Sequence, residues 1–173
     1  MREINKYEVL FGMNDTEFFV NEAIDEKNEE TSLKDFINLT KPKRKWSVIN
    51  PGFMIGVAHC YLGALFESNF KIDFQNIDFT SLKVIRIGAK RRFNENKDKI
   101  RALRNAIAHH NYKVYEELSI INDSRFSIQF IDGNPRIKDD FVEFSMSMID
   151  FFNFISECGV ILYAMSNKNK DRM

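Results

Sequence analysis

The chain has few residues that break secondary structure or cross-link it: three prolines, seven glycines and two cysteines in 173 residues. Cys60 and Cys158 form no C-x-x-C motif, so the sequence predicts neither a disulfide framework nor a redox pair. The three histidines and two cysteines show no zinc spacing, and no carboxylates cluster as two-metal chemistry requires. Glycine-rich phosphate loops, dinucleotide fingerprints and serine or cysteine nucleophile motifs are also absent. We therefore expect no metal and no cofactor.

Long uninterrupted apolar runs are absent as well. The most apolar stretch, residues 141–162, contains Glu143, Asp150 and Glu157, which a membrane span would accommodate badly. The first residues lack the apolar core of a signal peptide, and the low cysteine count suits a reducing compartment. These features predict a cytoplasmic protein without a membrane partner, and they favour a buried helix for residues 141–162.

Positive and negative charges balance, with 25 Lys and Arg against 25 Asp and Glu and a pI near 6.8. A protein that coats nucleic acid through bulk charge is therefore not expected. The charges are nevertheless segregated along the chain. Residues 1–40 hold ten acidic and four basic residues, whereas residues 83–104 hold nine basic and two acidic ones.

The length and the hydrophobic content of 44 % fit a single domain over residues 1–173. We expect a variable N-terminal helical part (1–45), a bundle core (46–165) and a frayed tail (166–173). Apolar spacing and capping signals predict helices at residues 3–11, 16–27, 32–39, 51–68, 80–90, 94–110 and 140–165. Alternating residues at 118–120 and 126–130 predict a β-hairpin. The expected fold class is mainly α: a helical bundle with a small β-hairpin inserted before the last long helix.

The most informative segment is Arg104-Asn105-Ala106-Ile107-Ala108-His109. Guanidinium binds phosphate oxygens through paired hydrogen bonds, and imidazole exchanges protons near neutral pH, so the two groups together suit a phosphodiester. An Arg-x(4–6)-His spacing arises often by chance, and from spacing alone Arg104 could equally pair with an acid on a neighbouring helix. The full string Arg-Asn-x-x-Ala-His is rare by chance and favours an RNA substrate.

This string resembles the HEPN superfamily (higher eukaryote and prokaryote nucleotide-binding domains), whose RNase members carry Arg-x(4–6)-His on a bundle helix, often with Asn after the Arg. The doubled His109-His110 is also similar to the Arg-Asn-x-x-Ala-His-His string of some abortive-infection proteins. The motif covers about one helix. The resemblance implies a HEPN-like helical bundle with a hairpin before the last helix, and an RNase toxin of toxin-antitoxin or phage-defence systems that acts at a composite dimer cleft.

Helix periodicity separates the two histidines of the motif. Ile100, Leu103, Ala106 or Ile107, and His110 form one apolar stripe, which predicts that His110 is a core or interface histidine. Asn105 and His109 are one turn apart on the neighbouring face. We therefore predict Arg104, Asn105 and His109 as the catalytic residues, with His110 and Tyr112 as secondary candidates. His59 lies mid-helix among apolar residues, and we interpret it as structural.

The basic run before the motif supplies candidate RNA contacts: Arg91, Arg92, Lys97 and Arg101. A solvated helix face without a ligand is the alternative interpretation of such a run.

RNA cleavage without a metal requires a base for the 2′-hydroxyl, an acid for the leaving 5′-oxygen and a cation for the phosphorane. His109 suits either proton step and Arg104 suits the phosphate, whereas Asn105 has three candidate roles: orienting the phosphate, orienting the imidazole or bonding within the helix. One histidine does not serve comfortably as base and acid together. A two-fold homodimer that apposes two copies of this helix would supply the second.

Two other hypotheses remain open. One is a catalytically silent HEPN-like module that binds RNA, a nucleotide or a protein partner through the same face. The other is a structural or immunity protein with no nucleic-acid role.

The toxin hypothesis adds an antitoxin or nucleotidyltransferase as a candidate partner. In some HEPN pairs such a nucleotidyltransferase modifies a tyrosine that lies close after the histidine. Tyr112 fits the His-x-Tyr spacing only when counted from His110.

Overall fold

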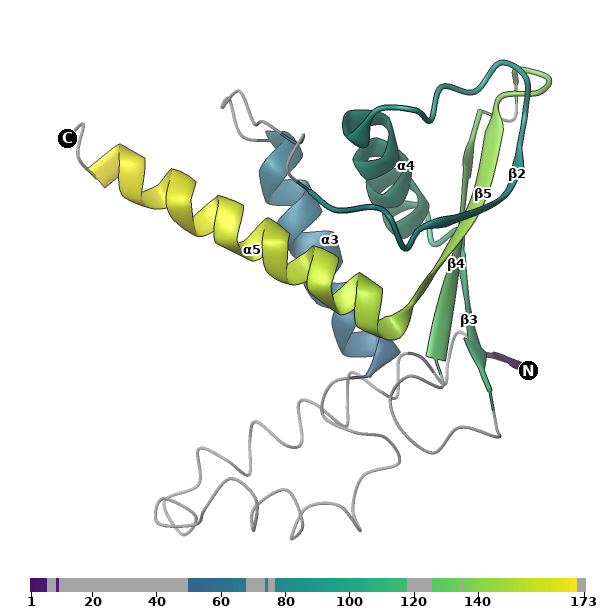
Figure 1. The fold of residues 1–173 in the computed structure, drawn as a ribbon, viewed down its shortest axis with the longest axis horizontal. Coiled ribbons are helices and arrows are strands. Elements are labelled where there is room, and N and C mark those ends of the chain that lie inside the picture. The colour runs from purple at the N-terminus through teal and green to yellow at the C-terminus, as the bar shows by residue number, and fades with distance from the viewer. Residues whose placement is uncertain are drawn as a thin grey trace, which may run out of the picture.

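The computed structural model describes residues 1–5, 9, 50–67, 74, 77–117, 126–134 and 136–170. Within these residues, three helices lie on one side of a five-stranded sheet (Figure 1). In chain order the elements are β1 (Arg2–Ile4), α3 (Pro51–Glu67), β2 (Lys83–Ile87), α4 (Asn96–Ala108), β3 (Tyr112–Glu116), β4 (Phe126–Gly133), β5 (Phe141–Ser147) and α5 (Met148–Lys170). Helix α4 lies directly on the sheet against β4, and α3 packs against both α4 and α5.

The sheet is antiparallel throughout, with the strand order β1-β3-β4-β5-β2. Strands β3, β4 and β5 form a meander, in which Phe130 pairs with Tyr112 on one side and with Phe144 on the other. The two edge strands come from sequence-distant segments, β1 beside β3 and β2 beside β5. The register between β2 and β5 shifts between Val84 and Arg86, where the edge strand bulges.

The predicted mainly α fold class is wrong, because the sheet forms one complete layer of the described structure. Residues 83–87 form strand β2 rather than part of a helix, and residues 141–147 form strand β5 rather than the start of the last helix. Every residue of β2 is exposed, so its sequence carries no alternation of apolar and polar residues. Strand β5 runs straight into α5 without a break in its apolar character, which hides the boundary.

The true start of the last helix has its own capping signal. The Ser147 hydroxyl accepts a hydrogen bond from the Asp150 backbone N–H at 3.1 Å and donates to the Asp150 carboxylate at 2.5 Å. Ser147 is thus the N-cap residue of α5, and Asp150 is the third residue of the helix. The expected start at Asp140, with Glu143 as its third residue, is one strand too early.

The predicted hairpin is present, but its first strand is β3, Tyr112–Glu116. Residues 118–120, which the alternation favoured, lie outside the described residues. At the N-terminus, β1 occupies the start of the helix predicted for residues 3–11. Val9 N–H then donates to the Asn5 carbonyl at 3.1 Å, which is helical spacing. The helices predicted at residues 16–27 and 32–39 lie outside the described part of the chain.

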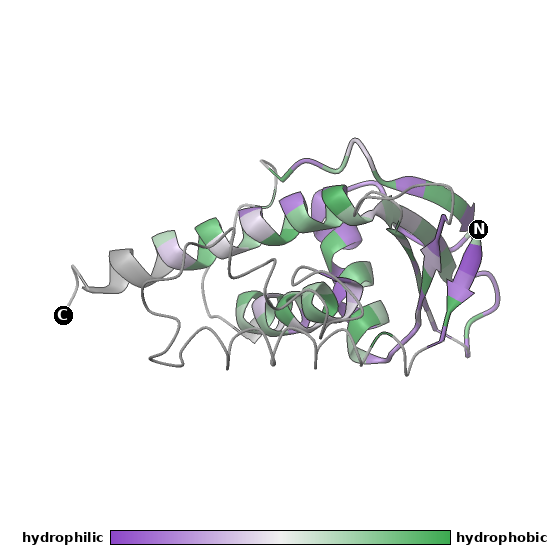
Figure 2. Cartoon of the chain, turned by 90° about the horizontal axis from the view of Figure 1, so that it is seen from below, coloured by the Kyte–Doolittle hydropathy of each residue, from purple (hydrophilic) through white to green (hydrophobic). Residues whose placement is uncertain are grey.

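Phenylalanine side chains fill the space between the sheet and the helices. Phe130 lies 5.4 Å from Phe144 and 5.4 Å from Phe151, measured between ring centroids, so β4, β5 and α5 share one aromatic cluster. All three rings are fully buried. Aromatic rings in such offset and tilted pairs contribute roughly 0.5–1.5 kcal/mol beyond their buried area. Figure 2 shows that hydrophobic and hydrophilic residues are interspersed on both the helices and the strands.

Helix α3 has the expected extent, with Pro51 in its first turn. Asn50 is fully buried, and its side-chain oxygen accepts the Phe53 backbone N–H at 3.1 Å, which caps the helix. His59 and Cys60, in the middle of the helix, are both exposed. Both cysteines are free, and burial raises the pKa of Cys158 to about 12.

Each helix among the described residues is too short or too polar to cross a bilayer.

The C-terminus of α4 ends in a Schellman motif built around His110. The His110 N–H donates to the Ile107 carbonyl at 3.1 Å, and the Asn111 N–H donates to the Ala106 carbonyl at 2.7 Å. His110 has a φ of 55°, the left-handed conformation that glycine usually supplies at this position. The helix therefore ends before His110, which is exposed, and its predicted place on the apolar stripe is wrong.

This backbone geometry predicts that His110→Gly is more stable to urea than His110→Ala by about 1 kcal/mol. A left-handed conformation costs a residue with a Cβ atom roughly 1–2 kcal/mol, and glycine avoids most of that cost. Alanine keeps the strain and so serves as the matched comparison. Equal unfolding midpoints for the two variants would contradict a left-handed residue 110.

Candidate functional site

Helix α4 carries the motif and is held at both ends. Its buried face consists of Ile100, Ala102, Leu103, Ala106 and Ile107. At its start, the Asn96 side-chain amide donates to the carbonyl oxygens of Phe74 at 2.9 Å and Ile77 at 2.8 Å. Because one face is buried between α3 and the sheet, the opposite face of α4 must point outward, and that face includes Arg104 and His109.

The Arg104 guanidinium is oriented by two neighbours. Its Nη1 donates to the Asn105 side-chain oxygen at 3.1 Å, and its Cζ lies 5.7 Å from the centroid of the Phe66 ring on α3. A cation at this distance from an aromatic ring is attracted by the ring quadrupole. Arg104 makes no ion pair with any residue that the structure describes. The alternative in which Arg104 pairs with an acid of a neighbouring helix therefore finds no support there.

Asn105 and His109 lie one turn apart, as their spacing predicts. The His109 N–H donates to the Asn105 carbonyl at 2.9 Å, so His109 belongs to the last turn of the helix, and its side chain is exposed. Three roles were predicted for Asn105. Its side-chain oxygen accepts a hydrogen bond from Arg104 of the same helix, rather than orienting the imidazole of His109.

Arg104 and His109 stand at opposite margins of the exposed face. Five residues of helix correspond to a rotation of about 140° between the two side chains. Ala108, a small residue, separates them on the surface. Within one protomer this geometry aims both groups outward from the end of α4 but does not direct them toward each other.

The two secondary candidates lie around the turn that follows α4. The rings of His110 and Tyr112 are 6.3 Å apart at an angle of 55°. Together with β1 they line a pocket of about 360 Å³. Tyr112 is only 8 % exposed, and burial raises the pKa of its phenol. The structure places Tyr112 within the sheet, which limits access to it by a modifying enzyme.

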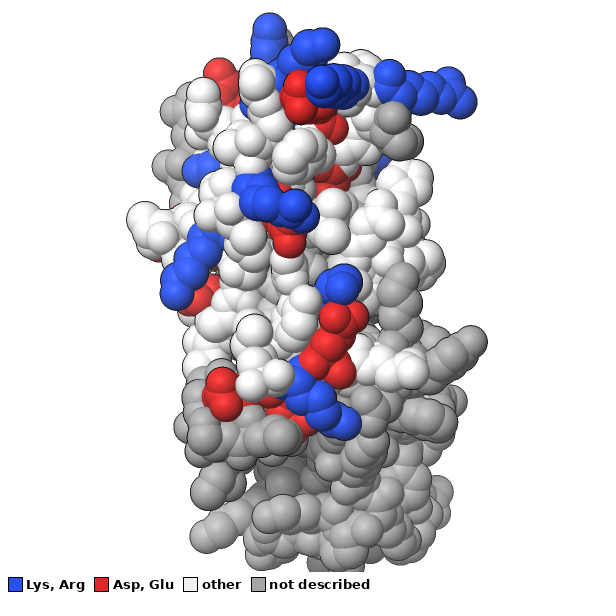
Figure 3. Space-filling model, turned by 90° about the vertical axis from the view of Figure 1, so that its right-hand side faces the viewer, with Lys and Arg blue, Asp and Glu red and all other residues white. Residues whose placement is uncertain are grey.

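The four basic residues proposed as RNA contacts divide into two kinds. Arg92, Lys97 and Arg101 are exposed and make no ion pair with any described residue. Lys97 and Arg101 lie on the same face of α4 as Arg104, within about 60° of helix rotation. Figure 3 shows Lys and Arg side chains gathered at the end of the molecule where the β2–α4 connection runs.

Arg91, in contrast, is mostly buried and serves the fold. Its guanidinium pairs with Asp132 of β4 and, at 3.3 Å, with Asp140 just before β5, and only 15 % of its side chain is exposed. The buried Asp132, 8 % exposed at its side chain, balances the charge of Arg91. Sequence spacing does not predict this role of Arg91, because the two acids lie 41 and 49 residues further along the chain.

No group of three or more His, Cys, Asp or Glu side chains suited to a metal ion occurs among the described residues. The chemical groups in the last turns of α4 are thus a guanidinium held by Asn105 and Phe66, a carboxamide and an imidazole, which can bind a phosphate and transfer protons.

A comparison of the sequence with known protein families finds a match that includes the motif and its helix. The sequence profile of the HEPN pEK499 p136 family matches residues 6–170. This chain belongs to the HEPN superfamily. HEPN domains are often RNase toxins or defence modules, and they typically act as dimers that bind RNA. No curated protein and no solved structure gives a significant match.

The ion pairs of Arg91 predict a marked loss of stability in Arg91→Gln. The change leaves the buried Asp132 without its cation, and breaking a buried pair costs roughly 3–5 kcal/mol. Arg92→Gln is the matched control, because the Arg92 side chain is exposed. This substitution should change the free energy of unfolding by less than about 0.5 kcal/mol. Urea unfolding of both variants measures the difference. Similar midpoints would mean that Arg91 is not part of the core of this fold.

Proposed function

We propose that this HEPN domain is a metal-independent endoribonuclease that acts as a homodimer, with Arg104, Asn105 and His109 at its site. The observation that carries the proposal is the hydrogen bond between Arg104 and Asn105 near the end of α4, with Arg104 exposed and with His109 exposed one turn beyond Asn105. Asn105 holds one edge of the guanidinium, which leaves its other donors available for phosphate oxygens.

The chemistry follows from these three groups. The 2′-hydroxyl of the RNA attacks the adjacent phosphorus, a new O–P bond forms, and the bond to the 5′-oxygen breaks. His109 accepts the hydroxyl proton or donates a proton to the leaving oxygen, and Arg104 stabilises the negative charge on the phosphorane. Asn105 is a positioning residue, because it acts through Arg104.

A second protomer completes this scheme. One His109 cannot easily serve as base and acid in the same step, and within one protomer Arg104 and His109 diverge by about 140° around the helix. A two-fold axis near the end of α4 would bring two arginines and two histidines to one phosphodiester.

For the cellular role, we propose a cytoplasmic toxin or phage-defence effector that acts on RNA. An antitoxin or a nucleotidyltransferase is the expected partner class. The low exposure of Tyr112 makes it a poor acceptor for a nucleotidyltransferase unless the turn after α4 opens.

The first test compares variants of the motif in cleavage of single-stranded RNA. His109→Ala and Arg104→Ala should each lower the rate by roughly 100-fold or more with little change in melting temperature, because both side chains are exposed. Arg104→Lys should recover little, since an ammonium cannot form the paired contact. His59→Ala is the matched control, an exposed histidine on α3 that should retain full activity.

The same assay separates the proposal from its rivals. Cleavage should persist in EDTA and weaken as salt rises. Loss in EDTA with recovery in magnesium would refute the metal-independent chemistry. Wild-type protein that binds RNA without cleaving it would favour the catalytically silent module, and protein that binds no RNA would favour a structural or immunity role.

A second test addresses the composite site. Wild-type and His109→Ala chains are mixed in equal amounts and allowed to exchange subunits. If each cleft needs both histidines, only wild-type pairs cleave, and activity falls to about one quarter of that of an equal total amount of wild-type protein. Independent sites would give one half. A wild-type chain that light scattering finds monomeric and active at tens of micromolar would remove the composite site.

A further inference from the structure

A second anion-attracting feature lies at the opposite end of α4 from the motif. A pocket of about 260 Å³ opens there, lined by Lys90, Arg91, Arg92, Asp98, Arg101 and Asp140. The residues come from the β2–α4 connection, the first turns of α4 and the residue just before β5. Lys90 directly precedes Arg91 and Arg92 and adds a third cation to this basic run.

The pocket has a net positive charge. Arg91 is paired with both Asp140 and Asp132, so this group of one cation and two acids carries one net negative charge. Lys90, Arg92 and Arg101 make no ion pair with any residue of the described segments. Asp98 is the one lining acid left to oppose these three cations. An anion entering the pocket therefore meets a surplus of positive charge.

The walls of the pocket are fixed before any ligand arrives. Backbone hydrogen bonds join Lys90 N–H to the Asp139 carbonyl at 3.0 Å and Gly88 N–H to the Phe141 carbonyl at 2.8 Å. A Cβ atom at residue 88 would lie 2.1 Å from the Asp139 oxygen, so only glycine permits this close approach. With the Arg91 ion pairs, these contacts tie the β2–α4 connection to the segment before β5. A preformed site loses little free energy to ordering when it binds.

We propose that this pocket binds a phosphodiester of the same RNA strand that is cleaved at the other end of α4; the inference rests on the proposed function. Its volume is just below the roughly 300–1,000 Å³ of pockets that enclose whole small molecules, and it suits a phosphate with part of its ribose. The surplus of cations selects for an anion of this kind.

The length of α4 sets the spacing between the two sites. Asp98 and His109 are eleven residues apart, which corresponds to about 16 Å of helix. At the roughly 3.4 Å rise of a stacked strand, that distance spans at most about five nucleotides. Arg101 lines the pocket and lies one turn from Arg104, so it continues the basic path between them. The preferred substrate is thus a single strand long enough to reach both sites, rather than a dinucleotide.

The test uses 2′-O-methyl oligonucleotides of two, four and six nucleotides, which cannot be cleaved because their 2′-oxygens are blocked. Fluorescence anisotropy with the full chain measures affinity at several salt concentrations. The wild type should bind the six-mer at least about tenfold more tightly than the dimer, because only the six-mer reaches both ends of α4. Arg92→Gln/Arg101→Gln should remove most of this gain, and the slope of log affinity against log salt should decrease by about 0.7, the loss of one phosphate contact.

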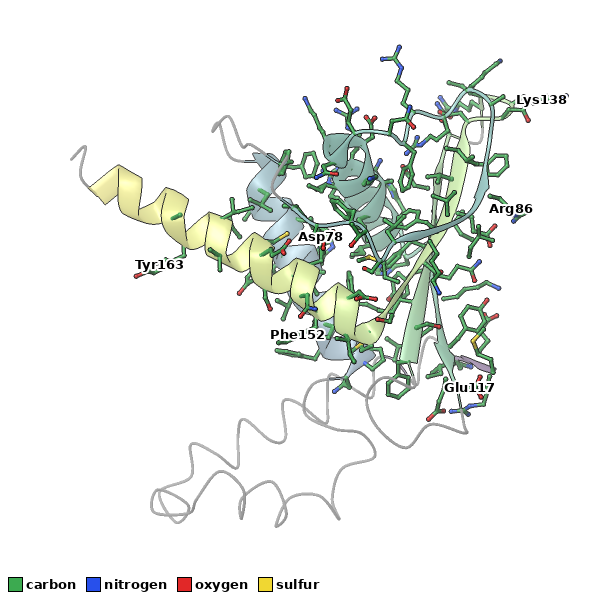
Figure 4. The ribbon with its side chains drawn as sticks, in the orientation of Figure 1. Asp78, Arg86, Glu117, Lys138, Phe152 and Tyr163 are labelled. Carbon is green, nitrogen blue, oxygen red and sulfur yellow. The ribbon has the colours of Figure 1, made fainter. Side chains whose placement is uncertain are left out.

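Two further variants make the result specific to the pocket. Asp98→Asn removes the opposing acid and should tighten six-mer binding, which loss of folding could not do. Arg136→Gln/Lys138→Gln is the matched control, with two exposed cations lost from the turn between β4 and β5, where Figure 4 labels Lys138. Melting temperatures confirm that each variant is folded.

Each outcome separates this inference from the nuclease proposal. Six-mer affinity and salt slope that are equal in the pocket double variant and the control would overturn the pocket while leaving the nuclease intact. Pocket-dependent six-mer binding by a wild type that cleaves no RNA would keep the pocket and remove the nuclease. A 5′-mononucleotide that binds as tightly as the six-mer would assign the pocket to a free nucleotide and overturn the strand proposal. No binding of any oligonucleotide would overturn both.

Discussion

The packing of α4 between the sheet and α3 is the contact on which the rest of the structure depends. Its apolar face, centred on Leu103 and Ala106, is fully buried, and burying such side chains contributes roughly 1.5–3 kcal/mol for each large residue. This burial fixes the rotation of the helix about its own axis. Once the rotation is fixed, Lys97, Arg101 and Arg104 can only face outward, and the pocket and the motif fall at the two ends of one exposed surface.

The helices that position the site could be predicted from the sequence, whereas most of the sheet could not, since β1, β2 and β5 all overlap predicted helices. Helix α4 has a clear apolar stripe, and α3 has a proline in its first turn, so both were located within about two residues. Strand β2 is not recognisable as a strand because it is exposed on both faces. Strand β5 is not recognisable because its apolar run continues into α5. Periodicity distinguishes strand from helix only where one face is buried and the chain signals a break.

The same limit applies to the candidate site. Helical spacing alone predicts that Asn105 and His109 lie one turn apart on the same side of the helix, and no tertiary information is needed. The environments of Arg91 and His110 depend on tertiary structure and on where the helix ends. Arg91 is engaged by acids from a distant segment, and His110 lies beyond the last turn, in a backbone conformation that a helical projection does not include. A sequence shows which residues are basic, but not which of them are already neutralised.

The bulged edge of the sheet at β2 affects how the protein behaves in solution. Val84, Ile85 and Ile87 are nearly half exposed on a terminal strand, a combination that would ordinarily recruit further strands and lead to aggregates. The bulge interrupts the regular sequence of backbone donors and acceptors there, and Arg86 extends from the side of the sheet away from the helices to pair with Glu143 (Figure 4). A foreign strand would have to accept an irregular hydrogen-bond ladder and a charged neighbour. The bulge and the ion pair thus protect the edge at β2 against uncontrolled polymerisation, even though the strand exposes three large hydrophobic side chains.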